Sequence, residues 1–274
     1  MVSASRPLVA CLVLALPLLA LSLPAHASTI VTTADGAGDD VHVRNGSKRN
    51  RTTNYNGQEM LQVKNGGSVA NNAHRKAYLR FDLSAGTESI TPGQIESAML
   101  SLTPVDTGAG RTPANRTWSF SVYGLAHDHT PEDGAYDKHW PADEIDWSSA
   151  PANTPREENL TVHGNALRRD QVTLVGAFEL TGKGIDQTVR ISNNVLADFL
   201  SSSPDQTIAF IVVRNTPENE GQPNNYVHGF AAAEHQTLEA PTLDLTVTSE
   251  PASSMSGGLD TLRMASSDRQ TPTH

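Results

Sequence analysis

The most constraining feature of this sequence is a recurring pattern of short runs in which apolar and polar residues alternate. Alternation with a period of two places successive side chains on opposite faces of an extended strand. Clusters of Gly, Pro, Asn and Asp, which favour turns, separate the runs. The runs are rich in β-branched residues and lie at 41–44, 60–64, 76–83, 95–105, 118–125, 171–180, 207–215, 226–232 and 241–248.

One segment has helical spacing instead. The expected N-cap is Ser192, and Pro204 lies beyond the end. The apolar residues, which recur on a single helical face, are Val195, Leu196, Phe199 and Leu200. Many strands with almost no helix are typical of two packed sheets. We therefore predict an all-β fold, an antiparallel β-sandwich of the jelly-roll type with one short helix.

The two ends of the chain differ from the middle. Residues 1–27 combine Arg6, an apolar run at 8–23 and a final Ala-His-Ala, which is the pattern of a secretory signal peptide. We expect a secreted protein with a β-sandwich domain at 28–249. Residues 250–274 are rich in Ser, Gly, Pro and Thr, and we predict that this tail is disordered. No later apolar run approaches the ~18 residues of a membrane helix, so we expect no membrane span.

Charge and cysteine content limit the possible partners and the means of stabilisation. The 30 acidic and 20 basic residues give a net charge of −10, which argues against a nucleic-acid partner. The one cysteine, Cys11, lies in the predicted signal peptide, so the exported chain would need a large core or a metal rather than a disulfide. Basic residues nevertheless gather between positions 44 and 80: Arg44, Lys48, Arg49, Arg51, Lys64, Arg75, Lys76 and Arg80.

The run at 74–84, "HRKAYLRFDLS", has two unlike faces. One face holds Ala77, Leu79, Phe81 and Leu83, which suit a core. The other holds Lys76, Tyr78, Arg80 and Asp82. An aromatic ring can stack on a sugar, and Lys and Arg can pair with uronate or sulfate groups. Alternatively, Tyr78 and Arg80 pack beneath a loop, with Arg80 paired to a carboxylate; from this run alone we favour that second interpretation.

Catalytic motifs are scarce. The His- and acid-rich segment 127–139 has residue types that bind zinc or calcium, but it lacks the spacing of a zinc helix or an EF-hand, so a solvated loop is the better interpretation. The sequence has no Gly-x-Ser-x-Gly, phosphate loop or dinucleotide fingerprint. A polysaccharide lyase could recruit Tyr78, Tyr123, Tyr226 or one of several His residues as its base, and a glycosidase built on two distant carboxylates also stays open.

A structural calcium ion is a further prediction. Asp39 and Asp40 precede the first run, and Asp244 lies on the last one, facing away from its apolar neighbours. First and last strands are often neighbours in a jelly roll, and hard oxygen ligands suit calcium. We predict Asp40 and Asp244 as metal ligands.

Several segments together resemble one family. They are "DDVHVRNGS" at 39–47, "TTNYNGQEMLQVKNGG" at 52–67, "HRKAYLRFDLS" at 74–84, "IESAMLSLTPV" at 95–105, the segment 120–152 that ends in "EIDWSSAPA", and "FAAAEHQTLEAPTLDLTV" at 230–247. In order and spacing they are similar to the DNRLRE domain, also catalogued as carbohydrate-binding module family 96. The resemblance implies a jelly roll that binds acidic polysaccharide, with alginate as the best-known ligand class. It implies binding through Lys64, Lys76 and Arg80, with Arg75 at the edge.

The leading hypothesis is a secreted, non-catalytic module that binds an anionic polysaccharide of the uronate type. The predicted ligand-binding residues are Lys64, Arg75, Lys76, Tyr78 and Arg80. A polysaccharide lyase on the same fold and a structural module of the cell surface or extracellular matrix are the two alternatives.

Overall fold

The computed structural model describes residues 25–66, 74–86, 90–128, 136–154, 167–218 and 226–249. Residues 26–249 form one compact unit, and it is described here by itself. The predicted tail and nearly all of the predicted signal peptide lie outside the described residues, as does the middle of the His- and acid-rich segment. No helix in the described ranges is long and apolar enough to cross a membrane.

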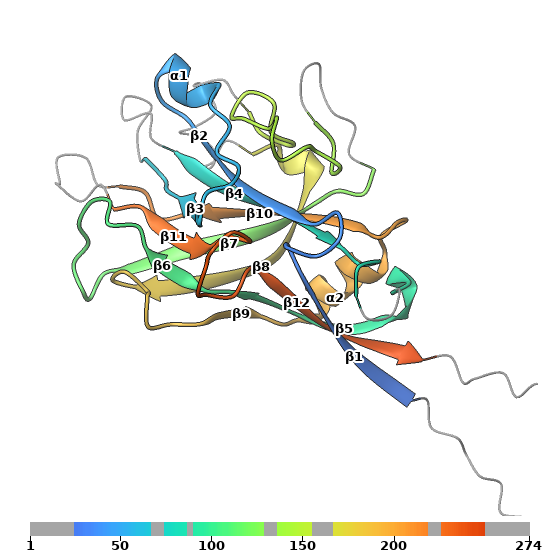
Figure 1. The fold of residues 1–274 in the computed structure, drawn as a ribbon. Coiled ribbons are helices and arrows are strands. Elements are labelled where there is room, and N and C mark those ends of the chain that lie inside the picture. Colours follow the sequence, from blue (N-terminus) through green and yellow to red (C-terminus); the bar gives the residue numbers. More distant parts are fainter. Residues whose placement is uncertain are drawn as a thin grey trace, which may run out of the picture. The chain divides into compact units, whose positions relative to one another are not determined.

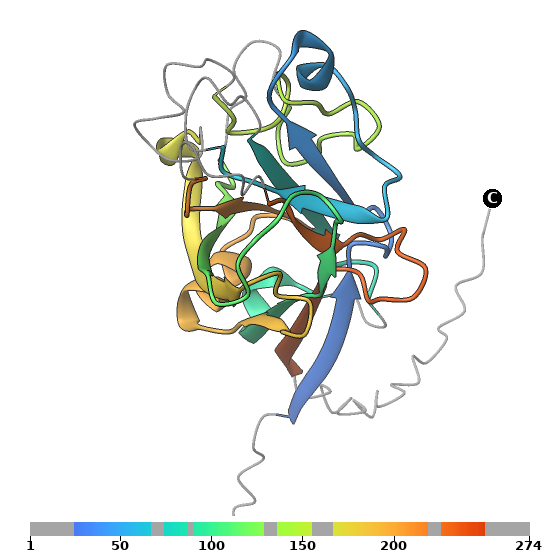
Figure 2. The same cartoon turned by 90° about the vertical axis from the view of Figure 1, so that its left-hand side faces the viewer.

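The unit is built from antiparallel strands in three sheets (Figures 1 and 2). Sheet A has the order β1-β12-β5-β9, sheet B the order β2-β4-β10-β7-β8, and sheet C the order β3-β11-β6. The strands are β1 (Ala25–Thr32), β2 (Asp39–Arg44), β3 (Met60–Val63), β4 (Arg75–Asp82), β5 (Ile95–Leu102), β6 (Pro104–Asp106), β7 (Thr117–Leu125), β8 (Val172–Thr181), β9 (Val189–Ile191), β10 (Thr207–Arg214), β11 (His228–Ala231) and β12 (Thr242–Ser249). The helices are α1 (Lys48–Arg51) and α2 (Asn194–Ser201), with 3₁₀ turns η2 (Pro92–Gln94) and η4 (Arg169–Gln171).

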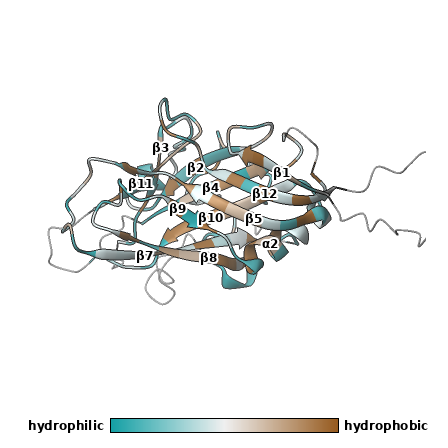
Figure 3. Cartoon of the chain, turned by 90° about the horizontal axis from the view of Figure 1, so that it is seen from below, coloured by the Kyte–Doolittle hydropathy of each residue, from teal (hydrophilic) through white to brown (hydrophobic). Residues whose placement is uncertain are grey.

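The main core lies between one face of sheet B and the facing sheets A and C. Alternate residues of β4, namely Ala77, Leu79 and Phe81, enter it together with Phe210 of β10 and Leu100 of β5. Brown and teal residues alternate along β5 and β12 in Figure 3, as expected of strands with one buried face. The predicted all-β sandwich is therefore confirmed, as is the inward face predicted for β4.

Helix α2 closes one part of this core. Its N-cap is Asn193, whose side chain accepts a hydrogen bond from the Leu196 amide, and not Ser192 as the sequence predicted. Asn193 satisfies an amide that the first helical turn would otherwise leave without a partner. Leu196, Phe199 and Leu200 turn inward, as predicted, whereas Val195 is half exposed.

The other face of sheet B is also buried, which alternation alone does not predict. Residues 136–154, hereafter the cap segment, cross that face and bury Trp140, Ile145 and Trp147 against it. In Figure 1 the cap segment is the yellow-green chain on the side of sheet B opposite β5 and β12. A second hydrophobic core lies beneath it, formed with side chains of sheet B such as Val43 and Tyr78.

Three elements were not predicted from the sequence, and one predicted run is in fact two strands. Strands β1 and β9 and the four-residue helix α1 have no clear pattern in the sequence. The predicted run 95–105 is two strands, β5 in sheet A and β6 in sheet C, separated at Thr103. Asp39 and Asp40 do not precede the first strand, because they begin β2 and β1 comes before them.

Candidate functional site

Three of the five predicted ligand-binding residues lie under the cap segment. Lys76, Tyr78 and Arg80 project from β4 on the face of sheet B that carries the second core, as alternation requires. Lys76 and Tyr78 are 2% and 1% exposed, and Arg80 is half-buried. The alternative stated for this face, side chains packed beneath a loop, therefore describes their position.

Each of these three side chains holds the cap segment in place. Lys76 Nζ donates to Asn153 Oδ1 and lies 4.7 Å from the centre of the Trp147 ring. Tyr78 donates its hydroxyl hydrogen to the Pro151 carbonyl at 3.1 Å. Arg80 donates to the carbonyls of Ala37 and Trp140 and stacks on the Trp140 ring.

Burial changes the chemistry of these groups. It lowers the pKa of Lys76 well below its usual value, because removal from water penalises the ammonium form. Burial likewise raises the pKa of the Tyr78 hydroxyl, so its deprotonation is unfavourable. As they stand, Lys76 and Tyr78 contribute to the packing of the cap segment and are not open to solvent.

The remaining two predicted residues, Lys64 and Arg75, lie next to each other elsewhere. Their backbones form an antiparallel bridge, with Lys64 N–H donating to Arg75 O at 3.0 Å and Arg75 N–H donating to Lys64 O at 2.9 Å. Arg75 is also the direct cross-strand partner of Arg44 in the β2–β4 pair. We call Arg44, Lys64 and Arg75 the basic cluster.

The members of the basic cluster repel one another. The pKa of Lys64 is lowered to about 8, mainly by burial and also by the charges of Arg214, Arg75 and Arg44, while Glu218 acts in the opposite direction. Burial also lowers the pKa of Arg75 to about 10, with Arg44 as the second cause. The Glu218 carboxylate is already engaged, because it accepts a hydrogen bond from Arg214 Nη2 at 2.6 Å inside the protein.

Buried donors of the basic cluster lack partners. The Nε atoms of Arg44 and Arg75 make no hydrogen bond to any residue that the structure describes. Arg75 does donate through Nη1 to the Gln62 side chain. A buried guanidinium donor without an acceptor is costly, and a bound carboxylate or sulfate would supply the missing acceptor.

Polar and aromatic groups border the basic cluster. Tyr55, half-buried, stacks on His42 with ring centroids 4.8 Å apart. Burial lowers the pKa of His42 to about 3, and Arg75 and Arg44 lower it too, so the ring stays neutral. Tyr55, Gln62 and Arg44 reach the surface in part, which gives this site the mixture of ring, amide and guanidinium suited to an acidic sugar.

The predicted metal ligands Asp40 and Asp244 lie in different sheets. Asp40, on β2, accepts hydrogen bonds from Thr33 Oγ1 at 2.5 Å and from the Ala233 amide at 3.0 Å. Asp244, on β12, accepts from Ser28 Oγ at 3.1 Å. Within the described ranges, no three His, Cys, Asp or Glu side chains are placed to hold a metal ion.

The structure thus separates the predicted ligand-binding residues into two groups, one under the cap segment and one where the end of β3 meets the start of β4. It brings Lys64 and Arg75 together and adds Arg44, which the sequence showed only as one of many basic residues. It also adds Tyr55 and Gln62, whose only signal was their place in the "TTNYNGQEMLQVKNGG" segment. Arg75 and Lys76 are adjacent in sequence and therefore point to opposite faces.

Comparison with known protein families gives a match to part of the chain. The model of carbohydrate-binding module family 96 matches residues 32–167. No curated protein matches the chain. The matched range includes β2, β4 and β7 but ends before β10, the strand that joins β4 to β7 in sheet B, so the folded unit extends beyond the match.

Proposed function

Because this chain contains a carbohydrate-binding module family 96 domain, we propose that it is a secreted, non-catalytic module whose ligand is an anionic polysaccharide of the uronate type. The observation that carries the proposal is the basic cluster. Arg44, Lys64 and Arg75 lie close together although the chain as a whole has a net charge of −10.

The charge balance around the basic cluster supports an anionic ligand. Arg44 and Arg75 are directly opposite each other on neighbouring strands, an arrangement that is destabilising for like charges. A uronate carboxylate between them would relieve this repulsion and accept hydrogen bonds from their guanidinium groups. A neutral sugar would do neither.

The site suits modest affinity for each sugar unit and stronger binding to a polymer. An exposed ion pair contributes less than about 1 kcal/mol and a half-buried one about 1–2 kcal/mol, so one sugar residue would bind weakly. A chain that places successive carboxylates along the same surface gains from multivalency. The exposed Lys48 and Arg49 of α1 follow Arg44 closely in sequence and would extend the basic surface.

Affinity electrophoresis on alginate, pectate and a neutral glucan, at low and high salt, tests this function. We expect retardation by at least one uronate polymer and a marked loss of that retardation at high salt, because salt screens partly exposed charges, whereas any retardation by the glucan should not depend on salt. The double variant Arg44→Gln/Arg75→Gln should lose the retardation. No retardation by either uronate polymer, or retardation that neither high salt nor the double variant reduces, would refute the proposal.

A polysaccharide lyase is the second candidate. The tyrosines that could serve as its base are at most 6% exposed: Tyr78, Tyr123 and Tyr226. Burial also raises the pKa of Tyr78, and it raises the pKa of Tyr226 to about 12. These positions favour the non-catalytic function. Incubation with alginate or pectate should therefore produce no rise in ultraviolet absorbance from unsaturated uronate; a steady rise would favour the lyase instead.

Secretion and calcium stay predictions with their own tests. N-terminal sequencing of the exported protein should give a sequence that begins at Ser28 if residues 1–27 are removed.

Calcium held by Asp40 and Asp244 should raise the melting temperature of the wild type and not that of Asp244→Asn. No change in the wild type on chelation and re-addition of calcium would exclude this ion as a structural element.

A further inference from the structure

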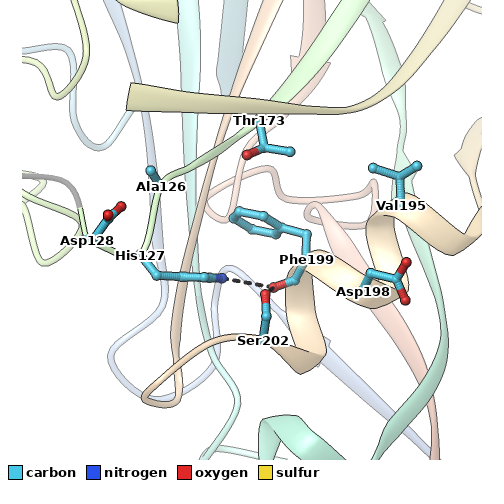
Figure 4. Close-up of a pocket in the computed structure, with 8 residues that line it drawn as sticks. All are labelled: Ala126, His127, Asp128, Thr173, Val195, Asp198, Phe199 and Ser202. Atoms are coloured by element: carbon cyan, nitrogen blue, oxygen red, sulfur yellow. Dashed lines mark hydrogen bonds between the residues drawn. The ribbon is translucent and has the colours of Figure 1, made fainter. Parts of the chain in front are cut away.

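A pocket lies beside α2. It has a volume of about 530 Å³ and is lined by Ala126, His127, Asp128, Thr173, Val195, Asp198, Phe199 and Ser202. Figure 4 shows these side chains gathered from the segment after β7, from β8, and from α2 and its C-cap. A volume of this size is in the range of pockets that hold small ligands. None of its lining residues belongs to the basic cluster.

The floor of this α2 pocket is fixed by close packing. Phe199 lies over the backbone of Gly124, where an added Cβ would come within 2.3 Å of Phe199 Cζ. The His127 ring stacks on Phe199 with centroids 4.5 Å apart, and His127 Nε2 lies 2.9 Å from the Phe199 carbonyl oxygen, to which it donates (Figure 4). The two rings therefore hold their positions without a ligand.

The rim of the pocket combines apolar and hydroxyl groups. Val195 is 50% exposed, an unusual position for an aliphatic side chain on a helix whose other apolar residues are buried. The hydroxyl groups of Thr173 and Ser202 also line the pocket, and that of Ser202 donates to the Phe199 carbonyl oxygen at 3.0 Å. Sugars present C–H and O–H groups side by side, and a mixed lining of this kind matches them.

The charge of the pocket is opposite to that of the basic cluster. Its charged side chains are the exposed carboxylates of Asp128 and Asp198, and no lysine or arginine lines it. Neither carboxylate has a hydrogen-bond or ion-pair partner among the residues that the structure describes. A uronate would bring a further negative charge close to both, whereas sugar hydroxyls would donate hydrogen bonds to them.

We propose that the α2 pocket binds a neutral saccharide, separately from the uronate site. The apolar contacts come from Val195 and Phe199, and Asp198 accepts hydrogen bonds from sugar hydroxyls. The module then has two sites of opposite charge, one for an acidic polymer and one for an uncharged sugar. This proposal does not depend on the function of the basic cluster.

Amide shifts of the full chain in two-dimensional NMR test the proposal, with cellobiose, maltose and mannobiose as neutral probes. At least one probe should cause saturable shifts confined to residues 126–128, 173 and 194–202. Asp198→Ala should weaken that binding about tenfold, the usual effect of losing a hydrogen bond to a charged group. Val195→Arg should abolish it by filling the rim, and Asp186→Ala, an exposed aspartate outside the pocket, should leave it unchanged.

Controls separate this site from the uronate site. Arg44→Gln should leave the neutral-sugar shifts intact, and galacturonate should not shift the α2 amides. The proposal is overturned if no neutral probe shifts those amides, or if the shifts persist in both Asp198→Ala and Val195→Arg. A response to glucosamine alone would also overturn it, because the pocket would then be a cation site.

Discussion

The substitution Arg44→Gln separates ligand binding from stability. It removes the guanidinium charge from the basic cluster and keeps part of the aliphatic stem of the side chain. Arg44 is half-buried, and its Nε has no hydrogen-bond partner among the described residues. If Arg44 pairs with a uronate carboxylate, its loss should cost about 1–2 kcal/mol, between an exposed ion pair and a buried charged hydrogen bond. Affinity for the uronate polymer should then fall about five- to thirtyfold.

Stability should not fall with affinity. Arg44 and Arg75 face each other across β2 and β4, and removing one charge relieves a repulsion of about 0.2–1 kcal/mol. For a domain of this size, that change raises the melting temperature by at most about 4 °C. The expected combination is weaker binding with an unchanged or higher melting temperature, measured by affinity electrophoresis and calorimetry without ligand.

The matched substitution Arg80→Gln should give the opposite result. Arg80 donates to the carbonyls of Ala37 and Trp140, so its loss leaves two acceptors without their donor. Stability should fall by about 1–3 kcal/mol, while uronate affinity stays within twofold of the wild type, or about 0.4 kcal/mol. If Arg80→Gln loses uronate binding and Arg44→Gln does not, the ligand binds the other face of sheet B and the reasoning from the basic cluster is wrong.

Three further predictions concern the fold. Burial raises the pKa of Asp40 to about 7, so the folded state binds more protons than the unfolded chain between about pH 4 and 7. The stability that protonated Asp40 contributes is therefore full below about pH 4 and is lost as pH rises through 7. Urea unfolding should therefore show Asp40→Asn gaining stability relative to wild type as pH rises from about 4 to 8, and a constant difference would contradict this. Trp147→Ala should cost about 3–5 kcal/mol in urea unfolding, because Trp147 is fully buried; a loss below about 1 kcal/mol would mean that the cap segment is not packed. Gly124→Ala should cost about 1–3 kcal/mol because its Cβ would collide with Phe199, whereas Gly93→Ala, with nothing within 4 Å, should cost much less in the same assay.

Much of the fold followed from the sequence because strand alternation is a local property. The inward face of β4, with Ala77, Leu79 and Phe81, could be predicted from its own residues, and so could the apolar face of α2. The resemblance to carbohydrate-binding module family 96 likewise rests on short segments in a fixed order, and the family model matches the region of all of them except the last, at 230–247. Strand β9 and helix α1 escaped prediction because three or four residues are too few to show a period.

The candidate site could not be predicted to the same extent, because it depends on what covers each face of sheet B. From the sequence, Lys76, Tyr78 and Arg80 form the polar face of a strand; only the fold brings the cap segment, some 60 residues later, over them. Arg44 and Arg75 are 31 positions apart, and the β2–β4 register makes them neighbours. The sequence by itself therefore determined which residues alternate and how they divide between two faces. Tertiary structure alone decided which polar face is buried and which cations meet, because burial and charge clustering arise from contacts between segments distant along the chain.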